Sequence, residues 1–183
     1  MSAYEPYNFG AYVLAVGVSP GGIPKQPQQS VRALRTGLLG DGRNHAKHIR
    51  PDRALSIWDY ELLKQLVSEG FALTPGTAGE NLTVVGLNVQ QMMPGTLLRI
   101  GKVLIRLEQP RKPCYVLDAI DPRLKDAIVG RCGYMASILG EGTIRPGMPI
   151  EVVCETNDLP PWKEALRAPG AIGYQMLAGP AGG

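Results

Sequence analysis

Aromatic residues and cysteines are scarce in this sequence, and their scarcity excludes some classes of protein. The 183 residues include two Phe, two Trp and three Cys, and no two cysteines are spaced as a CxxC pair. An odd set of separated cysteines does not make a disulfide framework, which indicates a reducing compartment. Aliphatic side chains must supply most of the core, and a hydrophobic fraction of 44% allows one of useful size.

Long apolar runs and a basic leader are missing as well. No Lys or Arg precedes Lys25, which is unlike a secretory signal, and the apolar run from Phe9 to Val18 is too short to span a bilayer. The net charge of +3 is spread without a basic stripe, which argues against nucleic acid as a partner. The sequence therefore predicts a cytoplasmic protein without a membrane segment, and its mild positive charge suits a pocket for an anionic small molecule.

Turn-forming residues are plentiful. The 23 Gly and 16 Pro lie between short apolar stretches, a pattern typical of many short elements joined by turns. Helical spacing predicts a helix over 59–69, capped by Ser56 or Asp59, and a shorter one over 121–129. The run 134–139 fits a strand or a helix. Alternating apolar residues predict the strands 12–18, 30–35, 53–57, 80–85 and 147–153, and a hairpin of 96–100 and 102–108.

These elements predict a protein that is mainly β with a few helices, folded as a barrel-like closed sheet. Residues 1–153 are expected to form the domain, and residues 154–183 a tail with a short helix and a flexible end. In the second arm of the hairpin, the apolar side chains of 103, 105 and 107 share one face. Arg106 and Glu108 lie on the other, more polar face.

Cys114 is the first residue with a chemical signature. It follows Arg111, Lys112 and the stiff Pro113, just beyond the end of a predicted strand. Nearby cations favour the thiolate, which is the form that binds a metal or attacks sulfur. The alternative is a loop cysteine that packs as a small hydrophobic residue.

Two further segments carry polar side chains in glycine-rich surroundings. In the loop 40–48, Asp41, His45 and His48 are candidate metal ligands, but the basic side chains of this loop suit phosphate equally well. A solvated turn, with Asp41 bonded to the backbone, is the structural alternative. In the second segment, Glu80 and Asn81 follow Gly79 at the start of a strand, where they could hold a cofactor or satisfy backbone groups.

Taken together, these segments resemble a MOSC domain, the module named from the C-terminal part of molybdenum-cofactor sulfurases. The resemblance runs from about Val13 to Val153, and the order and spacing of its stretches are more specific than any one of them. The stretches are Val18–Lys25, Gly37–Asp41 with the His45/His48 loop, Pro51–Ser56, Pro75–Thr83, Gln109–Cys114 and Gly142–Gly147. In particular, the chain resembles stand-alone bacterial members, some of which reduce N-hydroxylated bases and related N-oxygenated compounds.

The resemblance implies a β-barrel-like fold, a molybdopterin-type molybdenum cofactor and a functional cysteine at Cys114. On this reading Cys114 is the metal ligand and a catalytic residue, and Asp41 and Glu80 relay protons. The substrate is a small N-oxygenated molecule, and an external reductase supplies electrons. The residues expected to bind the cofactor are Arg43, His45, Lys47, His48, Arg53, Asn81, Arg111 and Lys112.

Two alternatives stay open. In the first, Cys114 accepts sulfur from a desulfurase and carries it as a persulfide to a metal centre. In the second, the domain binds the cofactor without catalysis. A homodimer is compatible with either reading. The chain departs from the family pattern at Ile49 and Arg50, where a His and two Gly often precede Pro51. It departs again at Cys132, where a small residue or Thr is expected, so that Cys132 is either a neutral substitution or a second thiol near the cofactor.

Overall fold

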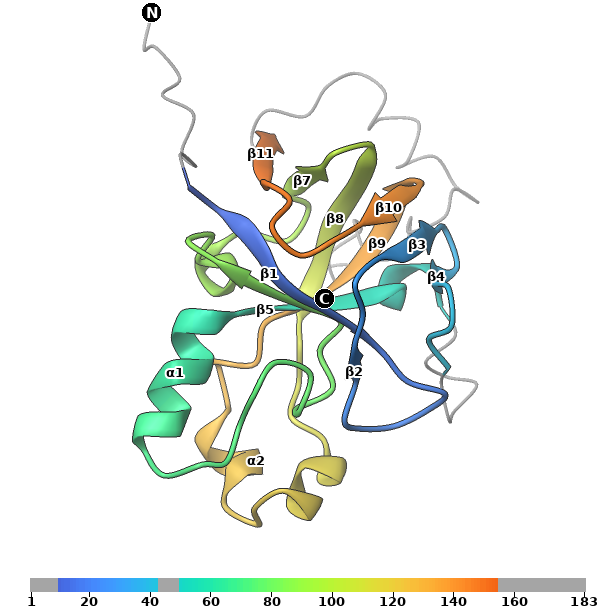
Figure 1. The fold of residues 1–183 in the computed structure, drawn as a ribbon. Helices are drawn as coiled ribbons and strands as arrows, with labels where there is room; N and C mark the ends of the chain where they lie inside the picture. The colour runs from blue at the N-terminus through green and yellow to red at the C-terminus, as the bar shows by residue number, and fades with distance from the viewer. Residues whose placement is uncertain (1–9, 43–49, 155–183) are drawn as a thin grey trace, which may run out of the picture.

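Strands dominate the structure, a computed structural model that describes residues 10–42 and 50–154. Within these residues the chain is mainly β with two α-helices, as the sequence predicts. Eight strands form a strongly curled sheet in the order β11-β7-β8-β9-β5-β6-β1-β2, and β10-β3-β4 form a second, small sheet (Figure 1). The strands are β1 (Tyr12–Val18), β2 (Gln26–Pro27), β3 (Val31–Leu34), β4 (Gly37–Leu38), β5 (Leu55–Asp59), β6 (Leu82–Val85), β7 (Leu97–Ile100), β8 (Val103–Pro110), β9 (Tyr134–Gly140), β10 (Gly142–Ile144) and β11 (Glu151–Cys154).

The prediction of a closed sheet is wrong, because the large sheet is an open half-barrel with β11 and β2 at its two ends. The segment before β11 does approach β1: Met148 and Ile150 exchange backbone hydrogen bonds of 2.9 Å with Val13 and Ala11. The pairing there stays a single bridge between Tyr12 and Pro149. The large sheet therefore does not close into a barrel.

The core lies inside the curl of the sheet, where alternate side chains of each strand point inward. In β8, Val103, Ile105 and Leu107 are fully buried, as their alternation predicts. A second cluster, which includes Trp58 and Leu66, packs between the sheet and the two helices α1 (Tyr60–Ser68) and α2 (Leu124–Ala127). The molecule thus has an aliphatic interior and a helical end (Figure 1).

The predicted helices are present but shorter than expected. The helix α1 ends before Gly70, whose positive φ of 100° suits the residue after a helix. Asp59 stands at its N-cap position, but its side chain does not cap the helix. It instead accepts hydrogen bonds from the backbone N–H groups of Val89 and Gln90, in a short 3-10 helix (Val89–Gln91). The run 134–139 is a strand, and the last strand begins only at Glu151.

A β-bulge interrupts the pairing of β8 with β9 between Leu107 and Gln109. Leu107 lies opposite Ala136, which faces the core, whereas Gln109 lies opposite Met135, which does not belong to the core cluster. The extra residue, Glu108, shifts the alternation by one position. Gln109 therefore leaves the core side, which it would occupy in a regular strand.

No helix within residues 10–42 and 50–154 is long and apolar enough to cross a membrane. The predicted tail and its short helix lie outside the described residues, so the boundary at residue 153 stays a prediction.

Candidate functional site

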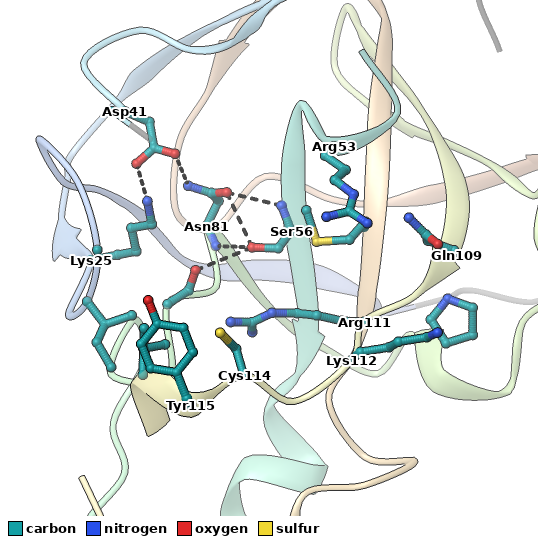
Figure 2. Close-up of a pocket in the computed structure, with 17 residues that line it drawn as sticks. Lys25, Asp41, Arg53, Ser56, Asn81, Gln109, Arg111, Lys112, Cys114 and Tyr115 are labelled. Atoms are coloured by element: carbon teal, nitrogen blue, oxygen red, sulfur yellow. Dashed lines mark hydrogen bonds and ion pairs between the residues drawn. The ribbon is translucent and has the colours of Figure 1, made fainter. Parts of the chain in front are cut away.

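A pocket of about 390 Å³ lies on the side of the sheet away from the aliphatic core, since Ser56 and Met135 alternate with the core residues of β5 and β9. Figure 2 shows the side chains that line it. Ser56 of β5, Met135 of β9 and Gln109 of β8 contribute to one wall. The rest comes from the loops after β1, β4 and β8, from the 3-10 helices Pro51–Arg53 and Tyr115–Ala119, and from the segment before β6. The lining residues are Gly22, Ile23, Lys25, Asp41, Gly42, Arg53, Ser56, Gly79, Asn81, Gln109, Pro110, Arg111, Lys112, Cys114, Tyr115, Val116 and Met135.

One wall of the pocket is a fixed network around Asp41. Its Oδ1 atom accepts hydrogen bonds from the Lys25 ammonium at 2.5 Å and from the Ser19 backbone N–H at 3.0 Å. Its Oδ2 atom accepts a hydrogen bond of 3.0 Å from the Asn81 amide. Both charged side chains are largely buried, with exposed fractions of 9% for Lys25 and 3% for Asp41. The carboxylate is thus paired and hydrogen-bonded, as a buried charge requires.

Asn81 joins this network to the sheet. Its Oδ1 atom accepts a hydrogen bond of 3.0 Å from the Ser56 backbone N–H, and its amide also donates to the Gly17 carbonyl. The Ser56 hydroxyl in turn accepts a hydrogen bond from the Asn81 backbone N–H. The Asn81 side chain therefore bridges β1, β5 and Asp41, and it fixes the polar wall before any ligand binds.

Two arginines that line the pocket, Arg53 and Arg111, have hydrogen-bonding capacity that the described residues do not fully use. Arg111 donates one Nη2 hydrogen bond to the Ala78 carbonyl, while its Nη1 atom is buried without a partner among the described residues. The Nε atom of Arg53 is also buried and has no partner within that part of the chain. A buried N–H group that lacks a partner costs about 1–3 kcal/mol. Both arginines line the pocket, which makes it a candidate site for an anion.

Cys114 lines the same pocket and is half-buried. It precedes the 3-10 helix Tyr115–Ala119, and its carbonyl accepts the first hydrogen bond of that helix, from the Leu117 N–H. The Arg111 backbone N–H donates to the Gly133 carbonyl and so holds the start of the loop against β9. Figure 2 shows the thiol beside the Arg111 guanidinium, which faces the cavity. Lys112 is exposed at the rim.

Glu80 does not line this pocket. Its Oε1 atom accepts hydrogen bonds from the Gly76 N–H at 2.6 Å and from the Thr83 hydroxyl at 2.9 Å. Its Oε2 atom is buried without a partner within the described residues. Burial raises the pKa of this carboxyl, and the hydrogen bond from Gly76 and the positive charge of Arg111 oppose the rise. Glu80 therefore lies behind Arg111 as a buried counter-charge.

The second thiol is more deeply buried than Cys114. Cys132 packs in the apolar cluster near α2 and is 2% exposed. Burial raises the pKa of its thiol, and the positive charge of Arg111 lowers it in part. Cys132 does not line the pocket either, which makes it a packing residue at the back of the Arg111 side chain.

The structure brings together six of the predicted site residues in one pocket: Asp41, Arg53, Asn81, Arg111, Lys112 and Cys114. The predicted residues Arg43, His45, Lys47 and His48 lie outside the described residues. Within residues 10–42 and 50–154, no group of three His, Cys, Asp or Glu side chains could hold a metal ion.

Sequence reasoning missed Lys25, Ser56 and Gln109 as pocket residues. Lys25 closes the stretch Val18–Lys25, so the resemblance already contained a signal for it. Gln109 reaches the pocket through the bulge, and the sequence has no clear mark of that bulge.

The fold and the site together define a class: an open, curled β-domain that presents a half-buried cysteine in a pocket rich in cations. Residues 44–151 match the model of the MOSC domain family, which is more than half of the chain. The chain therefore belongs to the MOSC domain family, which confirms the resemblance.

Individual relatives agree with this assignment. The chain is 30% identical over 141 residues to the uncharacterized protein YflK of Bacillus subtilis, covering 72% of this chain and 63% of YflK. It is 29% identical over 167 residues to protein YiiM of Escherichia coli, covering 86% of this chain and 72% of YiiM. The crystal structure of YiiM from Geobacillus stearothermophilus has a TM-score of 0.66 and 26% identity, covering 79% of this chain and 76% of that one. The chain thus spans less than two thirds of the length of YflK.

Proposed function

We propose that the pocket binds a molybdenum–pterin cofactor and that the protein reduces small N-oxygenated compounds, with Cys114 as the metal ligand. One observation carries the proposal: a half-buried cysteine and two arginines line the same pocket. Each arginine has a buried N–H group without a partner among the described residues. A soft sulfur donor and an anion subsite in one cavity are what a metal held by a phosphorylated organic ligand requires.

The pocket fits a molybdenum–pterin cofactor in size and in charge. A cavity of about 390 Å³ is within the usual range for cofactor sites. Arg53 and Arg111 would hold the phosphate with their guanidinium groups, and Lys112 would add a charge at the rim. When bound, the cofactor would supply two-electron removal of oxygen from an N–O bond.

The protein's own residues would bind and orient the ligands. The Asn81 and Ser56 side chains keep one wall in place, so that binding requires little rearrangement there. A proton relay through Asp41 or Glu80 stays a prediction. Glu80 does not line the cavity, so it has no direct contact with a ligand there. Electrons would come from an external reductase.

Molybdenum content tests the proposal directly. Wild type, Cys114→Ala and Cys132→Ala would be expressed in a host that makes the cofactor, and each would be measured by elemental analysis. We expect near-stoichiometric molybdenum in wild type and Cys132→Ala, and its loss in Cys114→Ala. The Cys132 variant is the matched control, because it removes a thiol that does not line the pocket. Equal molybdenum in all three proteins would refute the ligand role of Cys114.

An assay with an N-hydroxylated base and a chemical reductant then tests the reaction. Reduction by wild type and not by Cys114→Ala would support the proposal, whereas a loaded but inactive wild type would indicate a non-catalytic cofactor-binding module. The sulfur-carrier alternative is favoured by the position of Cys114, which is half-buried at an open cavity and so within reach of a donor. Absence of molybdenum together with a persulfide on Cys114 after incubation with a desulfurase would establish that alternative.

A further inference from the structure

Lys25 is a charged side chain of the pocket whose role the proposed function leaves unassigned. Its ammonium lines the cavity and is 2.5 Å from Asp41. We propose that Lys25 is the proton donor of the site and that it protonates the hydroxyl oxygen that leaves an N-hydroxylated substrate. This inference rests on the proposed reductase function.

The backbone of Lys25 is held in place from two sides. Its N–H donates a hydrogen bond of 2.8 Å to the Gly76 carbonyl. A Cβ atom at Gly76 would lie 2.5 Å from the Lys25 carbonyl oxygen, and one at Gly17 would lie 2.9 Å from the Lys25 Cβ. Both contacts are closer than side chains allow, so these two glycines make room for Lys25. The lysine is therefore built into the wall of the pocket and is not a freely moving surface side chain.

Asp41 fixes the ammonium while leaving protons available. The carboxylate takes three donors, from Lys25, Ser19 and Asn81, so its oxygens are engaged with the protein. An ammonium has three N–H bonds. Asp41 is the partner of one of them, and within the described residues the others have no protein acceptor. Those protons are available to a ligand in the cavity.

The other charged groups lining the described part of the pocket are less suited to this step. Arg53 and Arg111 are guanidinium groups, which do not release a proton in proteins. Lys112 is exposed at the rim. Asp41 is engaged with its three donors. Lys25 is thus the pocket side chain that is buried, positioned and able to transfer a proton.

The step balances with an external reductant. For a hydroxylamine the overall reaction is R–NH–OH + 2 e⁻ + 2 H⁺ → R–NH₂ + H₂O. As the N–O bond breaks, Lys25 gives one proton to the departing oxygen, which leaves as water. Solvent supplies the second proton to nitrogen, and the reductant supplies both electrons. The resulting neutral amine of Lys25 takes a proton back from solvent.

Two substitutions at Lys25 test the inference. Lys25→Arg keeps the positive charge and a donor for Asp41 but cannot release a proton, and Lys25→Met removes both. With an N-hydroxylated base and a chemical reductant, we expect Lys25→Arg to retain molybdenum and to lower kcat by about 10²- to 10⁴-fold, the usual contribution of a positioned acid. KM should change little. The control is Lys102→Arg, at an exposed turn outside the pocket, which should match wild type in all respects.

A nitrogen-15 spectrum of the lysine ammonium groups gives a readout that does not depend on turnover. The Lys25 signal should be visible because the buried group is hydrogen-bonded, whereas the exposed Lys112 should exchange too fast to be seen. The signal should weaken in Asp41→Asn and should shift when the N-hydroxylated base is added. An unchanged signal on addition of the base would show that Lys25 does not touch the substrate.

The outcomes separate this inference from the function on which it rests. Loss of molybdenum in the folded Lys25→Arg protein would make Lys25 a cofactor-binding residue and overturn its role as donor. Undiminished kcat in Lys25→Arg would overturn it as well, with the reductase function intact. A wild-type protein without molybdenum or without turnover would overturn the proposed function and this inference together.

Discussion

Two buried ion pairs in this protein have similar geometry but different surroundings. In the pocket, Lys25 and Asp41 are 2.5 Å apart, with exposed fractions of 9% and 3%. On β8, Arg106 and Glu108 are 2.7 Å apart, and each is 3% exposed. The first pair lines a cavity and the second does not.

The two pairs also differ in how the chain builds them. Arg106 and Glu108 are two residues apart on one strand, and the Ser137 hydroxyl of the neighbouring strand donates to the same Glu108 oxygen. Lys25 and Asp41 are 16 residues apart, and Asn81, 40 residues beyond Asp41, supports the carboxylate. Burial of an ion pair is thus no mark of function by itself. Support from distant segments around an open cavity is the feature that distinguishes the pocket pair.

Breaking the pair on β8 should have the largest effect on stability. Arg106→Met leaves Glu108 buried without its cation, which should lower the free energy of unfolding by about 3–5 kcal/mol. Urea denaturation followed by circular dichroism measures the change. The double variant Arg106→Met/Glu108→Leu removes both charges and should lose clearly less. An equal loss in the single and double variants would contradict this account of the pair.

Breaking the pocket pair should cost less. In Lys25→Met, Asp41 keeps its hydrogen bonds from Ser19 and Asn81 and borders a cavity that water can enter. We expect the free energy of unfolding to fall by about 1–3 kcal/mol, the cost of one unsatisfied partner. The same urea titration, run beside Arg106→Met, gives the comparison. A loss as large as that in Arg106→Met would place Lys25 among the structural residues.

The pH dependence of stability should show how the buried carboxyl of Glu80 differs from the carboxylates of the two buried ion pairs. The pKa of Glu80 in the folded protein is raised by burial above the ordinary value of 4.5, so the folded state holds the proton more tightly than the unfolded state does. The protonated carboxyl favours folding below pH 4.5, and this contribution is lost as the pH rises through the folded-state pKa. Glu80→Gln should remove it. Relative to wild type, the variant should gain unfolding free energy between pH 4.5 and pH 7, and an unchanged difference across that range would count against the raised pKa.

An exposed pair should show the smallest effect. Asp121 and Arg123 are spaced like Arg106 and Glu108, but they lie at the surface, and the hydrogen bond from Arg123 lowers the pKa of Asp121 to about 2. The pair stabilises the fold above pH 3.8, and the benefit is lost as the pH falls toward 2. In Arg123→Gln the pKa of Asp121, followed by carbon-13 NMR, should rise toward 3.8, and stability at pH 7 should fall only slightly because the pair is exposed to solvent. A pKa that stays near 2 would show that Arg123 is not the cause.

Much of the fold follows from local patterns in the sequence. The strand Tyr12–Val18, the hairpin around Gly101 and the helix before Gly70 were predictable because alternation, helical spacing and glycine positions are local signals. The opening of the sheet was not predictable from such signals. It depends on how the segment around Pro149 meets β1, more than 130 residues away along the chain.

The sequence indicated which residues form the site better than it indicated the contacts between them. Six predicted residues line one pocket, because the resemblance placed them on segments that the family fold brings together. Arg106 and Glu108 were expected on the polar face of β8, and nothing in the strand itself shows that this face is buried. Lys25 was overlooked because its partner lies on another segment, and charge pairing across segments has no local signature.

Because of the bulge in β8, the side of the sheet on which Cys114 lies depends on the number of residues in the strand before it. Every position after Glu108 is one step out of phase with the first half of the strand. If Glu108 instead paired with Met135 in a regular strand, Gln109 would turn inward, and the segment leading to Cys114 would rotate toward the opposite side of the sheet. Deletion of Glu108 would remove the bulge and leave Gln109 opposite Met135, so a homologous chain without the extra residue would present the same segment on the same side, whereas an insertion after the bulge would turn that segment over.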